Sequence, residues 1–157
     1  MPDPSKDPSA ASLLGDLSIE LLISKSSLFQ NLDETGRRRL LEGGTLENYS
    51  PGQVIMTEGE PGDSFFFIKT GAVEVATMKG SEKLKLADLA AGDFFGEVSV
   101  ITAQPRTATV TAVSPVVAVK FQRRKISRLL MDYPEVTKLL NAKIEDRAAD
   151  TISKILK

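Results

Sequence analysis

Residues 46–122 constrain the fold most strongly, because short runs of alternating apolar and polar side chains recur there between clusters of turn residues. Glycine supplies the positive φ that tight turns need, and proline pre-sets the first corner of a turn. Short alternating runs separated by turn residues every eight to twelve positions or so are typical of a β-sandwich or barrel. We predict strands at residues 46–49, 53–57, 64–69, 72–78, 83–89, 106–113 and 116–121. Gly71, which separates two of these runs, predicts a β-hairpin.

Helical spacing precedes this β region. From Ser12 onward, leucines fall three and four residues apart on one helical face, and Ser18 is a candidate cap for a second helical start. Asp33 offers an N-cap for a helix over residues 34–42, which Gly43 and Gly44 would end.

Helical spacing returns at Arg123. A short helix is predicted to stop before Tyr133 and Pro134, since the residue before a proline is disfavoured in a helix. Pro134 suits the first turn of a last helix. The apolar stripe of that helix comprises Val136, Leu139, Leu140, Ile144, Ala148, Ile152 and Ile155.

The order of elements predicts one domain of the α+β class that is mainly β. Helices at residues 12–45 come first, an antiparallel β region at residues 46–122 follows, and helices at residues 123–157 come last. Residues 1–11, rich in proline, serine and aspartate, are predicted to be a disordered tail. Because the strands do not alternate with helices, a parallel α/β fold is not expected.

The composition excludes several classes of function. The 157 residues include no cysteine and no histidine, which excludes disulfides, thiolate catalysis, histidine metal ligands and a histidine-based triad. The formal net charge is −1, so no global positive field would attract DNA or an anionic membrane. No apolar run approaches the roughly 18 residues of a membrane span, and no signal peptide is evident at the start. We therefore expect a soluble cytoplasmic protein.

Residues 94–110 carry the chemistry that most favours a ligand site. Gly96 lets the backbone approach a ligand closely, and the short helical turn after it exposes N–H groups of Glu97, Val98 and Ser99, which favour an anion. Arg106 supplies a planar fork that matches phosphate oxygens, and Thr107 adds a hydroxyl beside it. Since phosphate would repel Glu97, this carboxylate suits hydroxyl groups, and together these groups describe a site for a ribose phosphate.

The spacing alone leaves a second interpretation open. A glutamate and an arginine nine residues apart more often form a surface ion pair, and Gly96 could mark a simple turn.

The wider sequence resembles a known family. Phe95-Gly96-Glu97 followed by Pro105-Arg106-Thr107-Ala108-Thr109-Val110 is similar to the phosphate-binding cassette of cyclic nucleotide-binding domains. Further matches to the family's strand and turn pattern lie at residues 51–55, 59–64, 66–68 and 71–75. The resemblance covers about residues 28–150. It implies an antiparallel β jelly roll (a double-stranded β-helix) with an N-terminal helical bundle and two C-terminal helices, the second of which is a lid.

The resemblance also implies roles for individual residues. Glu97 would bind the ribose 2′-hydroxyl, while Gly96 and Ser99 would offer backbone N–H groups. Arg106 and Thr107 would hold the cyclic phosphate, and Val75, Leu86 and Leu89 would form an apolar wall around ribose and base. Val98 and Ala108 are further expected ligand-binding residues. Ser99 stands where the family often has alanine, and Thr107 does not decide between cAMP and cGMP.

Arg147 matches the position at which prokaryotic ion-channel members of the family place a purine-capping arginine. A guanidinium plane can stack on a base. The alternative is that Lys143, Asp146, Arg147 and Asp150 form only the solvated face of an amphipathic helix.

The function that the resemblance implies is a regulatory sensor that binds cAMP or cGMP, needs no cofactor or metal and signals by moving its lid helix. Its partners would be the cyclic nucleotide and an unknown downstream protein, with no DNA or membrane binding, and it would be a monomer or homodimer. We expect no enzymatic activity, for want of a metal cluster or a general base. The alternative is a protein–protein interaction module whose pocket is vestigial or takes another nucleotide, such as cyclic di-GMP.

Overall fold

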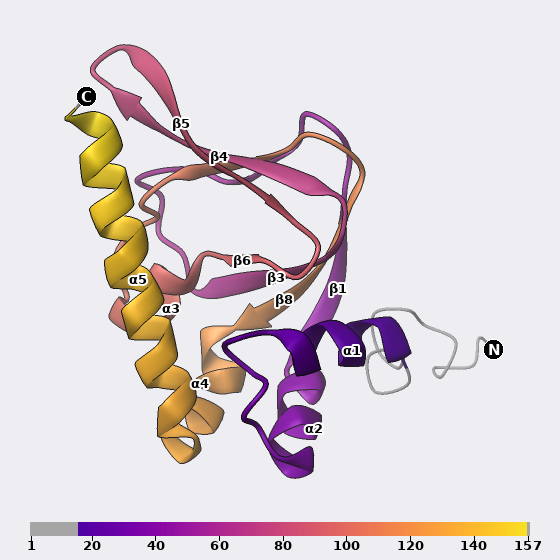
Figure 1. Cartoon of the computed structure of the whole chain (residues 1–157). Helices are drawn as coiled ribbons and strands as arrows, with labels where there is room; N and C mark the ends of the chain where they lie inside the picture. Colours follow the sequence, from indigo (N-terminus) through magenta and orange to yellow (C-terminus); the bar gives the residue numbers. More distant parts are fainter. Residues whose placement is uncertain (1–15, 157) are drawn as a thin grey trace.

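Two four-stranded antiparallel sheets face each other at the centre of the structure, a computed structural model in which residues 16–156 are described (Figure 1). The first sheet has the order β1-β8-β3-β6 and the second the order β2-β7-β4-β5. The strands are β1 (Gly44–Tyr49), β2 (Val54–Met56), β3 (Ser64–Thr70), β4 (Ala72–Lys79), β5 (Glu82–Ala90), β6 (Phe94–Phe95), β7 (Thr109–Ala112) and β8 (Val116–Gln122). Helices flank the sheets, so the predicted mixture of a β region with helices at both ends is confirmed.

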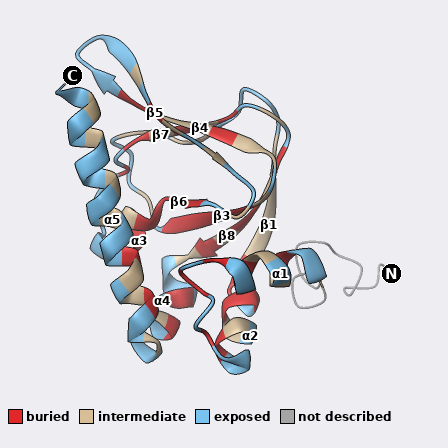
Figure 2. Cartoon of the chain, in the orientation of Figure 1, coloured by how far each residue is buried: buried red, intermediate tan, exposed pale blue. Residues whose placement is uncertain are grey.

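Strand β3 explains how the two sheets and the helices share one core. Most of β3 is coloured as buried in Figure 2. The apolar run at residues 65–68 is continuous because successive side chains point to two faces that are both buried. Phe65 and Phe67 pack with the helices, whereas Phe66 and Ile68 pack between the sheets. Phe65 also stacks on Phe121 of β8, with ring centroids 4.9 Å apart.

Two helices precede the sheets. Helix α1 (Leu17–Lys25) is capped by Asp16, whose side chain accepts hydrogen bonds from the backbone N–H groups of Ser18 and Ile19. The prediction of Ser18 as a cap is therefore wrong, because Asp16 stands one position before the helix and reaches its free N–H groups first. Helix α2 (Glu34–Glu42), with Asp33 as its N-cap, confirms the prediction. The predicted tail at residues 1–11 and the start of the leucine stripe lie outside the described residues.

The seven predicted strands are all present, but their pairing differs from the prediction at Gly71. Strands β3 and β4 lie in different sheets, so the predicted hairpin is wrong. Gly71 instead marks a crossing between sheets, with a φ of +93° and no room for a Cβ atom, which would lie 2.1 Å from the carbonyl oxygen of Pro115. The tight hairpin joins β4 to β5 at Gly80 and Ser81, between the paired residues Lys79 and Glu82.

Two further differences concern the segment that carries the predicted site. The strand predicted at residues 106–113 is shorter, because β7 begins only at Thr109. The two-residue strand β6 was not predicted, since two phenylalanines give no alternation to recognise. Between β6 and β7 lies α3 (Glu97–Thr102), the short helical turn that the sequence predicts.

Two helices follow the sheets, as predicted. Helix α4 (Arg123–Asp132) ends at Tyr133, and α5 (Pro134–Ile155) begins with Pro134 in its first turn. The Tyr133 hydroxyl donates to Asp33, the cap of α2, at 2.8 Å, so the corner between α4 and α5 is tied to the N-terminal helices. Only Val136 and Leu140 of the predicted stripe on α5 are fully buried. Within residues 16–156, no helix is long and apolar enough to cross a membrane.

Candidate ligand-binding site

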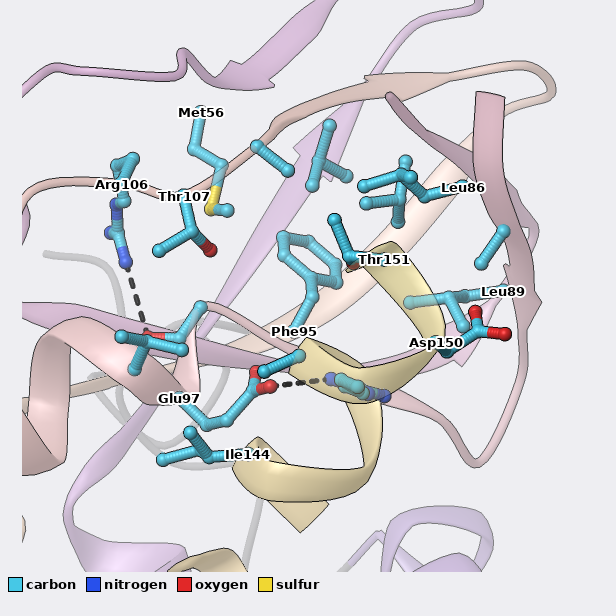
Figure 3. A pocket seen from close by; sticks show the side chains of 18 of the residues that line it. Met56, Leu86, Leu89, Phe95, Glu97, Arg106, Thr107, Ile144, Asp150 and Thr151 are labelled. Carbon is cyan, nitrogen blue, oxygen red and sulfur yellow. Dashed lines mark hydrogen bonds and ion pairs between the residues drawn. The ribbon is translucent and has the colours of Figure 1, made fainter. Parts of the chain in front are cut away.

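A pocket of about 390 Å³ lies between the second sheet, the segment around α3 and the second half of α5 (Figure 3). All eleven residues that the sequence nominates line it. They are Val75, Leu86, Leu89, Gly96, Glu97, Val98, Ser99, Arg106, Thr107, Ala108 and Arg147. The structure thus brings together residues separated by up to 72 positions in the chain (Val75 to Arg147), although their roles toward a ligand remain predictions.

Arg106 is the buried cation of the pocket, with 8% of its surface exposed. Its Nη1 donates to the carbonyl oxygens of Ser64 and Gly96, at 2.7 and 3.2 Å. Among the described residues, no carboxylate lies within ion-pair distance of the guanidinium, and Nε and Nη2 have no hydrogen-bond partner. Burial lowers the pKa of Arg106 from its ordinary value, and the charges of Asp63 and Glu97 act in the opposite direction. Since arginine stays protonated in proteins, Arg106 is a buried cation that has nearby carboxylates but no direct ion-pair partner among the described residues.

Glu97 is the buried acid of the pocket, with 4% of its surface exposed. Its Oε1 accepts a hydrogen bond from Nη1 of Arg147, on α5, at 2.8 Å (Figure 3). Arg147 also donates from Nη2 to the carbonyl oxygen of Phe94 at 2.8 Å, and its guanidinium carbon lies 4.5 Å from the centre of the Phe94 ring. One arginine therefore joins α5 to the segment that begins at β6.

The predicted purine-capping role of Arg147 concerns a stacking contact with a base. Here its guanidinium is directed to Glu97 and Phe94. The capping role stays a prediction.

The backbone of the cassette is held in a tight curve. Gly96 has a φ of +85°, and a Cβ atom there would lie 2.9 Å from the carbonyl oxygen of Ser64, so a glycine is needed. At the other end of α3, Ala103 also has a positive φ, of 59°. The Ser99 hydroxyl donates to the carbonyl oxygen of Gln104 at 2.9 Å. Ser99 therefore closes this turn with its side chain.

The remaining wall of the pocket is mostly apolar. Val75 is half-buried and Ala108 is buried. Leu86 and Leu89 lie on β5, opposite α5. Lys154, near the end of α5, donates a hydrogen bond to the carbonyl oxygen of Leu86 and forms an ion pair with Asp150 at 2.9 Å. Helix α5 is thus attached to the pocket at two places, by Arg147 at the cassette and by Lys154 at β5.

Sequence reasoning missed several residues of the site. Nine further residues line the pocket: Met56, Ala87, Phe95, Val110, Ile144, Ala148, Asp150, Thr151 and Ile152. Ile144, Ala148 and Ile152 belong to the predicted apolar stripe of α5, and their spacing was the signal that could have placed them. Gly62 was assigned only to a turn, yet a Cβ atom there would lie 2.1 Å from Nε of Arg106.

Two facing sheets enclose, together with residues of α5, a pocket lined by a buried guanidinium and a buried carboxylate. These are the features of a small-ligand-binding domain rather than of a structural repeat or a helical bundle. The family model described as "Cyclic nucleotide-binding domain" matches residues 46–133. The chain belongs to the cyclic nucleotide-binding domain family. The match ends at Tyr133, so α5 and Arg147 lie beyond it.

Similar proteins include regulatory subunits of protein kinases. The chain is 32% identical over 114 residues to the cAMP-dependent protein kinase regulatory subunit of Dictyostelium discoideum, covering 70% of this chain and 35% of that protein. The chain spans about a third of the length of the curated relatives it matches.

Solved structures share the fold. The regulatory domain of Toxoplasma gondii PKA with cAMP superposes with a TM-score of 0.75 at 24% identity, covering 81% of this chain and 48% of that one. The regulatory subunit of a cAMP-independent protein kinase A from Trypanosoma cruzi, bound to guanosine, gives a TM-score of 0.76 at 25% identity, covering 87% and 48%.

Proposed function

We propose that the chain binds a cyclic purine mononucleotide, cAMP or cGMP, and acts as a regulatory domain for a downstream protein. In this proposal the two facing sheets are the jelly roll that the family resemblance implies, and α5 is the lid. The role is one of binding rather than catalysis, in keeping with relatives that are regulatory subunits.

The buried guanidinium of Arg106, which has no direct ion-pair partner among the described residues, carries the proposal. Burying a charge without a directly paired counter-ion is costly, and an anion bound to Arg106 would reduce that cost. The open Nε and Nη2 donors fit a cyclic phosphate, since arginine pairs with phosphate through two parallel hydrogen bonds. Backbone N–H groups at the start of α3 would add to the same site.

Glu97 supports a ribose as the neighbour of that phosphate. A buried carboxylate accepts hydrogen bonds well but repels an anion, so a sugar hydroxyl is the group of the ligand that suits it. Because Arg147 reaches Glu97 from α5, a ligand at Glu97 would alter the attachment of the lid. A ligand that contacts both the cassette and α5 favours the closed position, which is how movement of α5 would report binding.

Isothermal titration calorimetry with cAMP, cGMP and cyclic di-GMP tests the proposal. We expect one of the two mononucleotides to bind, and Arg106→Ala to weaken its binding about 10- to 100-fold, since a hydrogen bond to a charged group contributes about 1.5–3 kcal/mol. The bound ligand should also stabilise the fold against heat, by about 2.7 kcal/mol at a hundredfold excess over Kd.

Arg128→Ala is the matched control, because this arginine is on the surface of α4, paired with Asp132 and 81% exposed at its side chain. It should leave the affinity unchanged. Binding of cyclic di-GMP alone, or of none of the three, would favour the interaction module instead. Equal affinity of Arg106→Ala and the unaltered protein would remove the phosphate assignment.

A further inference from the structure

Glu58 has a side chain that the proposed binding site does not use. It lies two residues after the end of β2, is half-buried and does not line the pocket. Thr77 of β4 donates a hydrogen bond from Oγ1 to Oε1 of Glu58, at 2.6 Å. The backbone N–H of Glu58 donates in turn to Oγ1 of Thr109, on β7, at 3.0 Å. One glutamate is therefore bonded to two neighbouring strands of the second sheet.

The residues that follow Glu58 hold Arg106 by its backbone. The N–H of Gly59 donates to the carbonyl oxygen of Arg106 at 2.8 Å, and the N–H of Arg106 donates to the carbonyl oxygen of Glu60 at 2.8 Å. This is a reciprocal pair of backbone hydrogen bonds of the kind that joins two strands, although neither segment is a strand here.

The same segment also limits the side chain of Arg106. The guanidinium passes so close to Gly62 that no Cβ atom would fit between them. Residues 59–62 therefore fix Arg106 on two sides, at its main chain and at its guanidinium. The hydrogen bonds of Glu58 with Thr77 and Thr109 hold the start of this segment against the second sheet.

We propose that Glu58 is a positioning residue for the anion site: it anchors residues 59–62 to strands β4 and β7, and through them it places the Arg106 guanidinium for the ligand. This inference rests on the proposed function, because it assumes that Arg106 binds an anion. Glu58 itself touches no ligand. A side chain that orients a binding group affects affinity through that group, since small displacements of the group weaken its hydrogen bonds.

A double-mutant cycle on the full chain tests this role, with the mononucleotide that calorimetry identifies as the probe. We expect Glu58→Ala to weaken binding about 3- to 10-fold when Arg106 is present. In the Arg106→Ala background, the same change should have almost no effect. Such non-additivity would distinguish an action through Arg106 from a general loss of structure, which adds to the loss from Arg106→Ala.

Three further variants make the test specific. Glu58→Gln keeps an acceptor for Thr77 and should bind nearly as tightly as the unaltered protein. Thr77→Val removes the same hydrogen bond from the β4 side and replaces Glu58→Ala in the cycle if Glu58→Ala folds poorly. It should cause the same loss of affinity as Glu58→Ala and the same non-additivity with Arg106→Ala. Glu47→Ala, which removes a half-buried carboxylate from β1 in the other sheet, is the matched control and should bind normally.

The outcomes separate the two proposals. If Arg106→Ala weakens binding but Glu58→Ala and Thr77→Val do not, the positioning role is wrong while the proposed function stands. Additive losses in the cycle would also overturn it. If Arg106→Ala has no effect, the phosphate assignment fails and the positioning role fails with it.

Discussion

At the scale of single residues, the site depends on the close approach of the backbone at Gly62 to the side chain of Arg106. Arg106 is buried beside carbonyl oxygens rather than carboxylates, so its position is set by dipoles and by shape. Gly62 supplies the shape, because the space that a side chain would take at this position is filled by the guanidinium. Its φ is ordinary, so the glycine is needed for this approach alone.

Gly62→Ala should therefore displace Arg106. A Cβ atom 2.1 Å from Nε cannot be accommodated without movement, and the flexible arginine side chain will move before the backbone does. We expect nucleotide affinity to fall about tenfold or more, while the free energy of unfolding falls by about 1–3 kcal/mol. Calorimetry measures the first and urea denaturation the second.

Gly52→Ala is the control for this change. Gly52 has a φ of +87° but open space around a Cβ atom, so alanine there brings backbone strain without a contact to the site. It should lower stability and leave affinity unchanged. A Gly62→Ala variant that binds as tightly as the unaltered protein would mean that Arg106 tolerates displacement.

At the scale of elements, the alternating pattern predicted the strands well but not their partners. The pattern indicates which faces of a strand are buried, and in β3 both faces are buried. Which strand lies beside which depends on contacts between distant residues, as at β3 and β8, where Phe65 opposes Phe121. The turn at Gly71 was misassigned for this reason, since a glycine with positive φ serves a hairpin and a sheet crossing equally well.

The site was predictable where one continuous segment carries it. Residues 96–99 and 106–108 could be nominated from their own chemistry and the resemblance, and the structure places them around one pocket. Gly62 and Glu58 were not predictable, because their contacts to Arg106 and to Thr77 exist only once separate strands have assembled. The ion pair of Arg147 with Glu97 likewise joins residues 50 positions apart.

Helix α1 is attached to the first sheet by an ion pair that should respond to pH. Lys69 of β3 lies 2.6 Å from Asp16, the cap of α1. Burial alone would raise the pKa of Asp16. Hydrogen bonds from Lys69, Ser18 and the N–H of Ile19, together with the charge of Lys69, outweigh that effect and lower the pKa to about 2. Because the folded-state pKa is below the ordinary value of 3.8, the carboxylate stabilises the fold above about pH 4, and this contribution is lost as the pH falls toward 2.

Asp16→Asn tests the contribution, since asparagine still caps a helix but carries no charge. At pH 7 we expect the variant to be less stable by about 1 kcal/mol, a value reduced for partial contact with water. The difference from the unaltered protein should narrow between about pH 4 and pH 2 in urea denaturation. A difference that is constant over this range would show that the ion pair adds no stability, and Lys69→Met should reproduce the effect from the other side.

At the scale of the whole molecule, the two halves of α5 differ in what they contact. Its first turns bury Val136 and Leu140 in the core shared with the N-terminal helices and the first sheet. From Ile144 to Leu156, every side chain is exposed or half-buried, and this part of the helix contacts the cassette and β5 and lines the pocket. The first turns of the helix thus belong to the core, and its later turns line the pocket.

A chain that ends at Lys143 should therefore fold but bind poorly. It keeps Val136 and Leu140, so we expect its free energy of unfolding to stay within about 2 kcal/mol of that of the full chain. It loses Arg147 and the apolar residues of α5 that line the pocket, so nucleotide affinity should fall at least about tenfold. A chain that ends at Ile152 keeps every lining residue and loses Lys154, and it should lose less affinity. Unchanged affinity in the shorter chain would show that α5 is not a lid, whereas an unfolded chain would place its second half in the fold itself.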